Sequence, residues 1–405
     1  MSTTRRSFLA ATATAPFILG ATDKAGIKNP ILGEGEHQYE CIHDWGEVPS
    51  NIKYGNTHSV VEDSQGHIYI HHTVHKDSPS SDAVVVFDNK GKFVKSFGAM
   101  FRGGAHGMHM NKEGKTEYIY FSDEKHGIVT KRTLKGEEVW TMGYPQASST
   151  YQKGPGSTGP GGANGLNYRP TNIAIAPNLD FWIVDGYGSY YAFHYTQKDG
   201  YPKLLNTFGG RPQPPAAAGG GGGGRGGAKG GPGGGAPGGG GAPAAAAAGG
   251  GAPGGGGPGR APAPIDQMNN PHGVWIDMRD PAKPMLLIAD RGNRRIVRYT
   301  MDDKPVDIIE GTLAPCHFHE YKDLMVVPDL QSRVTLFDKN NKVIEHLGDG
   351  NYAGKQNQLR VSENRKDFEP GKFITPHGAW FDHTGNIFVT EWVEIGRVTK
   401  LRKLA

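Results

Sequence analysis

The sequence lacks several features that would place it quickly in a functional class. Its formal net charge is only +4, spread along 405 residues, which gives no case for nucleic-acid binding. No Ser-His-Asp set can be recognised, because nothing in the spacing fixes the geometry of such residues. Cysteine is scarce, with two residues in the chain, Cys41 and Cys316. The common catalytic and nucleic-acid classes therefore find no support here.

Glycine, in contrast, is abundant, but much of it is confined to one tract. The chain has 62 glycines, and residues 212–264 consist almost only of Gly, Ala and Pro. Such a composition cannot bury enough apolar surface to offset the entropy of ordering. The tract also lacks the Lys and Thr of a phosphate-binding loop, which argues against a nucleotide role. We therefore predict a disordered insertion.

The N-terminus "MSTTRRSFLAATATAPFILGA" resembles a twin-arginine export signal, with Arg5 and Arg6 placed before Phe8 and Leu9. The apolar run that follows is short and contains threonines and Pro16, so it is a poor membrane span. We expect residues 1–21 to be a signal peptide and the mature protein, without a membrane span, to be periplasmic or extracellular. An ordinary secretory signal is the alternative.

A motif of the form Pro-His-Gly-x-Trp-x-Asp occurs twice, in "NNPHGVWID" from Asn269 and "ITPHGAWFD" from Ile374. When the chain is aligned on this histidine, six related segments appear. The residues at the shared position are His58, His106, Asn172, His272, His317 and His377.

Each segment continues with short alternating runs of β-branched and aromatic residues between turns rich in Asp, Asn and Gly, which is typical of strands. Four strands in each of six units predict an all-β, six-bladed β-propeller spanning residues 39–405. The predicted blades lie at about 58–98, 106–143, 172–209, 272–311, 317–348 and 377–402. The last blade lacks a fourth strand, so we expect residues 39–46 to close the ring as its outer strand.

This architecture separates the two cysteines. Cys41 would lie on the rim, whereas Cys316 would begin an innermost strand. The two are then too far apart for disulfide geometry, so we predict two free thiols.

The aligned position begins the innermost strand of each blade, so its residues should form a ring at one mouth of the central channel. Five of the six are histidine. They could simply fill the channel, but imidazole is the commonest metal ligand, and three leave a tetrahedral ion one open position. We favour zinc or another divalent metal held from alternate blades by His106, His272 and His377. His58, Asn172 and His317 are further ring residues.

Loops returning to the same mouth offer additional chemistry. Tyr187 lies in "DGYGS", Arg291 in "DRGNRR", and His72 ends the second strand of the first blade. Near an ion and an arginine, the pKa of a tyrosine would fall below its usual value, so Tyr187 could act as a base. An aromatic turn residue and an inter-blade ion pair are the plain alternatives for Tyr187 and Arg291.

With these residues in view, the repeats resemble NHL repeats, and the arrangement is similar to peptidyl-α-hydroxyglycine α-amidating lyase. That family holds zinc with three histidines on alternate blades, matched by His106, His272 and His377. Its tyrosine lies in an Asp-Gly-Tyr turn, matched at Tyr187, and its arginine in an Ala-Asp-Arg turn, matched at Arg291. The resemblance implies that Tyr187 takes a proton and that Arg291 steadies developing charge.

The sequence departs from that family at two positions. Where the family has Phe-His-Arg on the first blade, this chain has Ile70-His71-His72. Where the family has an aspartate that helps bind a structural calcium, this chain has Gly378. The family's copper monooxygenase domain is also missing, so the metal set is carried over better than the substrate.

The main hypothesis is an exported, metal-dependent lyase that cleaves the C–N bond of an α-hydroxy-amide to an amide and glyoxylate, or acts on a related small molecule or peptide. One alternative is a non-catalytic NHL propeller that binds a protein or glycan through the same mouth. Another is a propeller lactonase or a quinone-dependent dehydrogenase, although a lactonase should show carboxylates and asparagines around calcium.

Overall fold

The computed structural model of the chain describes residues 21–22, 28–148, 150–151, 168–210, 263–348 and 355–404. The predicted signal peptide and the predicted disordered insertion lie outside these ranges, apart from residues 21, 263 and 264. No helix within the described ranges is both long and apolar enough to cross a membrane.

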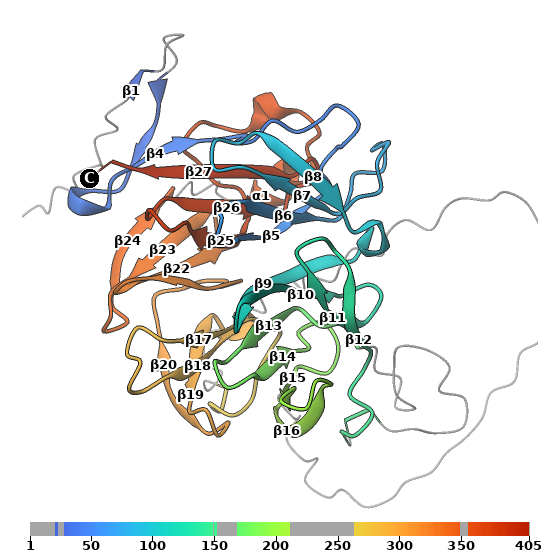
Figure 1. Cartoon of the computed structure of the whole chain (residues 1–405). Coiled ribbons are helices and arrows are strands. Elements are labelled where there is room, and N and C mark those ends of the chain that lie inside the picture. The colour runs from blue at the N-terminus through green and yellow to red at the C-terminus, as the bar shows by residue number, and fades with distance from the viewer. Residues whose placement is uncertain are drawn as a thin grey trace, which may run out of the picture.

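The described residues form six antiparallel sheets around a central axis, so the fold is a six-bladed β-propeller (Figure 1). Blade 1 consists of β5 (Thr57–Glu62), β6 (Ile68–His72), β7 (Val84–Phe87) and β8 (Phe93–Phe97). Blade 2 consists of β9 (Ala105–Glu113), β10 (Thr116–Asp123), β11 (Ile128–Thr133) and β12 (Glu138–Met142). Blade 3 consists of β13 (Asn172–Ile175), β14 (Asp180–Val184), β15 (Tyr191–Thr196) and β16 (Lys203–Gly209).

Blade 4 consists of β17 (Pro271–Asp277), β18 (Met285–Asp290), β19 (Arg295–Tyr299) and β20 (Pro305–Ile309). Blade 5 consists of β21 (His319–Tyr321), β22 (Leu324–Asp329), β23 (Arg333–Phe337) and β24 (Val343–Leu347). Blade 6 consists of β25 (Pro376–Phe381), β26 (Ile387–Glu391), β27 (Arg397–Lys403), β4 (Tyr39–Ile42) and β3 (Ile31–Leu32). A separate pair, β1 (Ala21–Thr22) and β2 (Lys28–Asn29), precedes them. The helices are short: η1 (Gly35–His37), η2 (Ala99–Phe101), η3 (Arg291–Asn293), α1 (Gln356–Arg360) and η4 (Arg365–Asp367).

The ring closes as the sequence predicts. Strand β4 pairs antiparallel with β27, Tyr39 opposite Lys403 and Ile42 opposite Lys400, so the two ends of the chain share blade 6. Figure 1 shows the blue β4 beside the red β27. The structure adds β3 as a fifth strand outside β4. Both cysteines are buried free thiols, as predicted.

Several of the hairpin turns are held by an aspartate. The carboxylate of Asp63 accepts hydrogen bonds from the backbone N–H groups of Gln65 and His67, two and four residues further on. Asp88, Asp338 and Asp382 repeat this pattern in blades 1, 5 and 6. An Asx turn of this kind satisfies the donors of a reversing chain, which explains the Asp-rich turns of the repeat.

Burial falls from the axis to the rim. All seven residues of the innermost strand β17 are buried, whereas the outermost strand β8 has none that is. Large side chains such as Trp182, Phe121 and Phe181 are fully buried within the blades. The innermost strands are therefore packed on both faces, which fixes the side chains that point into the channel.

A second repeated hydrogen bond fixes where the innermost strand begins in four of the six blades. In blades 3 to 6 the backbone N–H three residues before the aligned position donates to a buried carboxylate at the end of the second strand. The pairs are Arg169 with Asp185 (2.8 Å), Asn269 with Asp290 (2.7 Å), Ala314 with Asp329 (2.8 Å) and Ile374 with Glu391 (2.7 Å). These bonds hold the entering loop against its own blade and so position the ring residues.

Candidate metal centre

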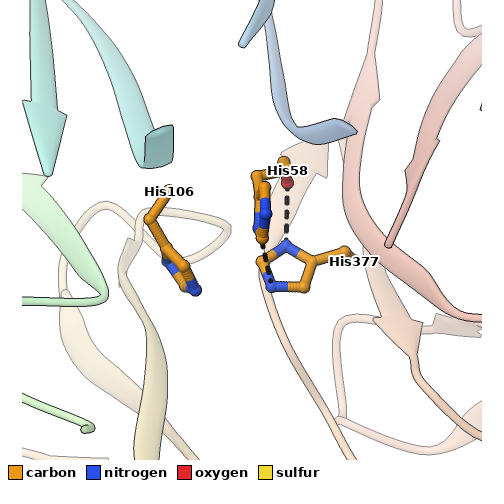
Figure 2. Close-up of side chains that lie close together, drawn as sticks. All are labelled: His58, His106 and His377. Atoms are coloured by element: carbon orange, nitrogen blue, oxygen red, sulfur yellow. Dashed lines mark hydrogen bonds between the residues drawn. The ribbon is translucent and has the colours of Figure 1, made fainter. Parts of the chain in front are cut away.

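Four of the aligned histidines converge on the axis. The ring centroids of His106, His272 and His377 lie 4.7–4.9 Å from one another. His58 lies 4.4 Å from His377 and 4.9 Å from His106 on the same measure. Figure 2 shows His58, His106 and His377 pointing toward one another from separate blades. The structure thus brings together the three predicted ligands and one further ring residue.

A β-bulge aims each of these side chains. In blades 1, 2, 4 and 6 the register between the first and second strands shifts at the histidine, because the first strand carries one extra residue there. In blade 3, Asn172 pairs regularly with Val184. Bulges of this kind re-aim side chains next to functional sites. The side chain at the aligned position therefore projects differently in blades 1, 2, 4 and 6 than in blade 3.

Each predicted ligand is tethered by its second ring nitrogen to a backbone carbonyl of the next blade. A carbonyl can only accept, so Nδ1 must carry the proton in each case. The pairs are His106 with Thr171 (2.6 Å), His272 with Cys316 (2.8 Å) and His377 with His58 (2.9 Å). This hydrogen bond fixes both the tautomer and the direction of the ring, as it does for metal-bound histidines.

The glycine after each of these histidines makes room for that same carbonyl. A Cβ on Gly107, Gly273 or Gly378 would lie 2.5, 2.7 and 2.6 Å from the carbonyl oxygens of Thr171, Cys316 and His58, respectively. Those atoms are backbone and cannot move aside cheaply. The repeated His-Gly pair is therefore one device: glycine admits the carbonyl, and the carbonyl orients the imidazole.

With Nδ1 protonated, Nε2 of each neutral ring presents a lone pair toward the axis. The hydroxyl of Tyr187 lies 3.2 Å from Nε2 of His106 and 3.1 Å from Nε2 of His272, and it has one proton for the two. Nε2 of His377 accepts from Nδ1 of His58 at 3.3 Å. The site therefore has more acceptors than donors, which is the condition that a cation would satisfy.

Burial keeps these imidazoles neutral. It lowers the pKa of His58, His106, His272 and His377 well below the usual value, and neighbouring histidines and the Arg291 guanidinium add to the effect. Neutral imidazole is the form that binds metal ions. The chemistry of this donor set thus fits a divalent ion of the zinc type.

Arg291, at the start of η3, joins the remaining groups of the site. Its guanidinium donates to the Tyr187 hydroxyl at 3.2 Å and to Oδ1 of Asn270 at 2.8 Å, and approaches Sγ of Cys316 at 3.7 Å. The lowered pKa predicted for Tyr187 depends on a nearby ion as well as on Arg291. Among the protein's own groups, burial raises the pKa of Tyr187 and Arg291 offsets this only in part.

Two sets of three ligand atoms lie within 4.8 Å of one another in the described part of the chain. One set is His58, His106 and His377, and the other is His272, Cys316 and His377. All five residues are buried, and His377 belongs to both sets. The metal-ligating groups of the mouth therefore extend beyond the three predicted histidines to His58 and a thiol.

The other candidates do not join this cluster. Asn172 accepts the N–H of its neighbour Ile173 at 2.8 Å. His317 donates instead to the carbonyl of Ala379, 3.2 Å away and two residues beyond His377 on β25. Among the described residues, His317 makes no ring contact with the other four histidines of the predicted ring.

His72 lies away from the four histidines as well. Its Nδ1 accepts the N–H of Val74 at 3.0 Å, and its ring packs edge-on against Tyr54 with centroids 4.8 Å apart. Tyr54 lines a cavity of about 350 Å³ together with His75 and Arg365. His72, at the place of the resembled family's arginine, therefore packs against one wall residue of this cavity, Tyr54, and does not line the cavity itself.

Three residues of the site were missed by sequence reasoning. Asn270 donates to the carbonyl of Gly186 at 2.5 Å while accepting from Arg291, so it ties the Tyr187 turn to Arg291. The guanidinium of Arg169 lies 5.2 Å from the Tyr187 ring centroid. Cys316 was assigned only as a free thiol. Asn270 had one available signal, its place directly before Pro-His-Gly.

Comparisons with known proteins find only distant structural likenesses. Neither protein-family models nor curated proteins give a match. Among solved structures, a streptogramin B lyase shares 11% identity over 91% of this chain and 99% of its own, with a TM-score of 0.49. A putative gluconolactonase shares 11% identity over 89% and 96%, with a TM-score of 0.45. These likenesses are too remote to bear on function. From its own sheet topology, the protein is a six-bladed β-propeller with a cluster of imidazoles on its axis.

Proposed function

We propose that this propeller is a metal-dependent carbon–nitrogen lyase of the amidating-lyase type, acting on a small molecule or peptide that carries an α-hydroxy-amide. The observation that carries the proposal is the position of the Tyr187 hydroxyl, 3.1–3.2 Å from two imidazole nitrogens and from the Arg291 guanidinium. A potential base, a cation and oriented metal ligands thus meet at one point.

Arg291 supports an anionic substrate. Arg291 is 7% exposed, and in the described part of the chain its guanidinium bonds an amide, a thiol and a phenol instead of a carboxylate. Buried charges are ordinarily paired, because an unpaired one forfeits its hydration. A substrate carboxylate, such as that of an α-hydroxyglycine terminus, would supply the missing partner.

The residues present fit a divalent ion, since His106, His272 and His377 offer three oriented Nε2 lone pairs. Such an ion, when bound, would supply Lewis acidity toward the substrate hydroxyl and lower the pKa of that hydroxyl. Tyr187 would then be free of its contacts with His106 and His272, and its oxygen would remain within reach of Arg291.

The reaction balances without an external oxidant or reductant. Tyr187, as the phenolate that the Arg291 charge favours against burial, takes the proton of the α-hydroxyl. The C–O electrons form the aldehyde carbonyl of glyoxylate while the C–N bond breaks, and its electron pair leaves with the amide nitrogen. Tyr187 returns the proton to that nitrogen. Arg291 holds negative charge at the tyrosine oxygen and the substrate.

The test is glyoxylate release from an α-hydroxyglycine peptide by the purified full-length protein after metal loading. Release that is lost on changing Tyr187 to Phe, with metal content unchanged, is the expected result. The matched control is Tyr201→Phe, since Tyr201 is 61% exposed and distant in role. A metal-loaded protein that releases no glyoxylate would overturn the lyase assignment.

The alternatives make different predictions for the same preparation. A binding propeller would retain a peptide or glycan through the mouth without consuming it. A lactonase would open lactones, but the buried carboxylates Asp185, Asp290 and Asp329 accept backbone N–H bonds instead of facing an ion.

Export through Arg5 and Arg6 stays a prediction, tested by the protein's cell fraction after these residues are changed to lysine.

A further inference from the structure

The axis also carries a thiol among its metal-ligating groups. Sγ of Cys316 forms a set with His272 and His377 in which every ligand atom lies within 4.8 Å of the others. All three residues are buried, Cys316 completely. A thiol with two imidazoles is a donor set of the kind that holds zinc in proteins.

The backbone at this point is fixed against His272. The carbonyl of Cys316 accepts from Nδ1 of His272 at 2.8 Å, and a Cβ on Gly273 would lie 2.7 Å from that same oxygen. The remaining nitrogen of His272, Nε2, is the one available to share an ion with the thiol. The two ligands are therefore held in place before any ion binds.

The side chain of Cys316 does not form the close hydrogen bonds to backbone carbonyls that the corresponding side chains of two other blades form. In blades 1 and 3 the residue before the aligned position is threonine, and its hydroxyl bonds backbone carbonyls. Thr57 lies 2.9 Å from the carbonyls of Glu391 and Arg397, and Thr171 lies 3.1 Å from those of Val184 and Pro271. Sγ of Cys316 has only long contacts in the described part of the chain, 3.5 Å to the carbonyl of Ala314 and 3.7 Å to Nη1 of Arg291.

We propose that Cys316 joins His272 and His377 as a ligand of the ion bound at this mouth and takes the place given above to His106, so that one sulfur and two nitrogens hold the ion and still leave a tetrahedral ion one open position. This rests on the metal site of the proposed function. On binding, the S–H bond breaks, a sulfur–ion bond forms, and the proton leaves to solvent. A mixed N and S set selects zinc-like ions over calcium or magnesium, which prefer oxygen ligands.

The first test loads the full-length protein with Co²⁺ and records its absorption spectrum. Wild type should show a near-ultraviolet sulfur-to-cobalt charge-transfer band beside the visible bands of bound cobalt. Cys316→Ser should lose the sulfur band. Cys41→Ser is the matched control, because Cys41 is also a buried free thiol but lies in β4, the fourth strand outward in blade 6, and it should keep the band.

A second measurement needs no variant and so does not depend on how Cys316→Ser folds. X-ray absorption of the zinc-loaded wild-type protein should show a sulfur neighbour at about 2.3 Å beside nitrogens at about 2.0–2.1 Å.

The outcomes separate this proposal from the proposed function. Bound metal without a sulfur neighbour or sulfur band would overturn the role of Cys316 and leave the metal site standing. A sulfur band that survives Cys316→Ser would overturn it too. Failure to bind either metal would overturn both proposals.

Discussion

The even and odd blades of this propeller differ at their innermost strands, although the sequence repeats through all six. Blades 2, 4 and 6 supply a His-Gly pair, and blades 1, 3 and 5 supply the carbonyl oxygens that orient the three imidazoles. The residues after the aligned position in the odd blades are Ser59, Ile173 and Phe318 rather than glycine. A sixfold repeat thus carries a threefold arrangement, in which each even blade presents an imidazole and the following odd blade supplies the carbonyl that orients it.

The largest effect should come from removing the even-blade imidazoles. Changing His106, His272 and His377 together to alanine should abolish metal binding, measured as metal per chain in the purified protein. His317→Ala, in an odd blade, should retain the metal, because His317 bonds Ala379 instead of facing the cluster. Equal metal content in the two variants would remove the distinction between the blade classes.

The next effect concerns Tyr187, whose hydroxyl lies between imidazoles of two even blades. Tyr187→Phe should lower kcat about 10²–10⁴-fold, the usual contribution of a positioned base. Metal content and thermal stability should stay close to wild type, measured on the same preparation. A small change in kcat would show that the hydroxyl only fills the space between the imidazoles.

Much of this arrangement could be predicted from sequence, because alternation and turn chemistry are local properties. The blades, the closing strand and the convergence of His106, His272 and His377 follow from aligning the repeats. The alignment could not distinguish His58 from His317, since the partner of each ring, Nε2 of His377 or the carbonyl of Ala379, belongs to another blade. Cys316 was missed for the same reason.

The direction of the Tyr187 pKa also lay beyond the sequence. The sequence motifs predict that Arg291 lies near Tyr187, and Arg291 does lower the pKa of Tyr187. Burial raises that pKa by more than Arg291 lowers it. Burial depends on packing of all six blades, which no single segment encodes.

A smaller effect should follow from filling the space beside an even-blade histidine. Gly273→Ala would place a Cβ 2.7 Å from the Cys316 carbonyl and 3.0 Å from Cα of His317. Overpacking against backbone should cost about 1–3 kcal/mol in the free energy of unfolding, measured by denaturant titration, and should weaken metal binding. Gly143→Ala is the control, because its nearest atom lies 3.9 Å away. An unchanged free energy with full metal binding would contradict the role given to the His-Gly pair.

The smallest expected effect tests whether the odd blades support the even ones through side chains as well as carbonyls. The hydroxyl of Ser59, in blade 1, donates to the carbonyl of His106, in blade 2, at 2.6 Å. Ser59→Ala should lower the free energy of unfolding by about 0.5–1.5 kcal/mol, because a buried carbonyl loses its donor, and should reduce metal affinity only slightly. The control is Ser64→Ala, whose hydrogen bonds to Glu117 are exposed. If Ser59→Ala instead released the metal as fully as loss of the imidazoles, Ser59 would have to be counted as part of the site and not as its support.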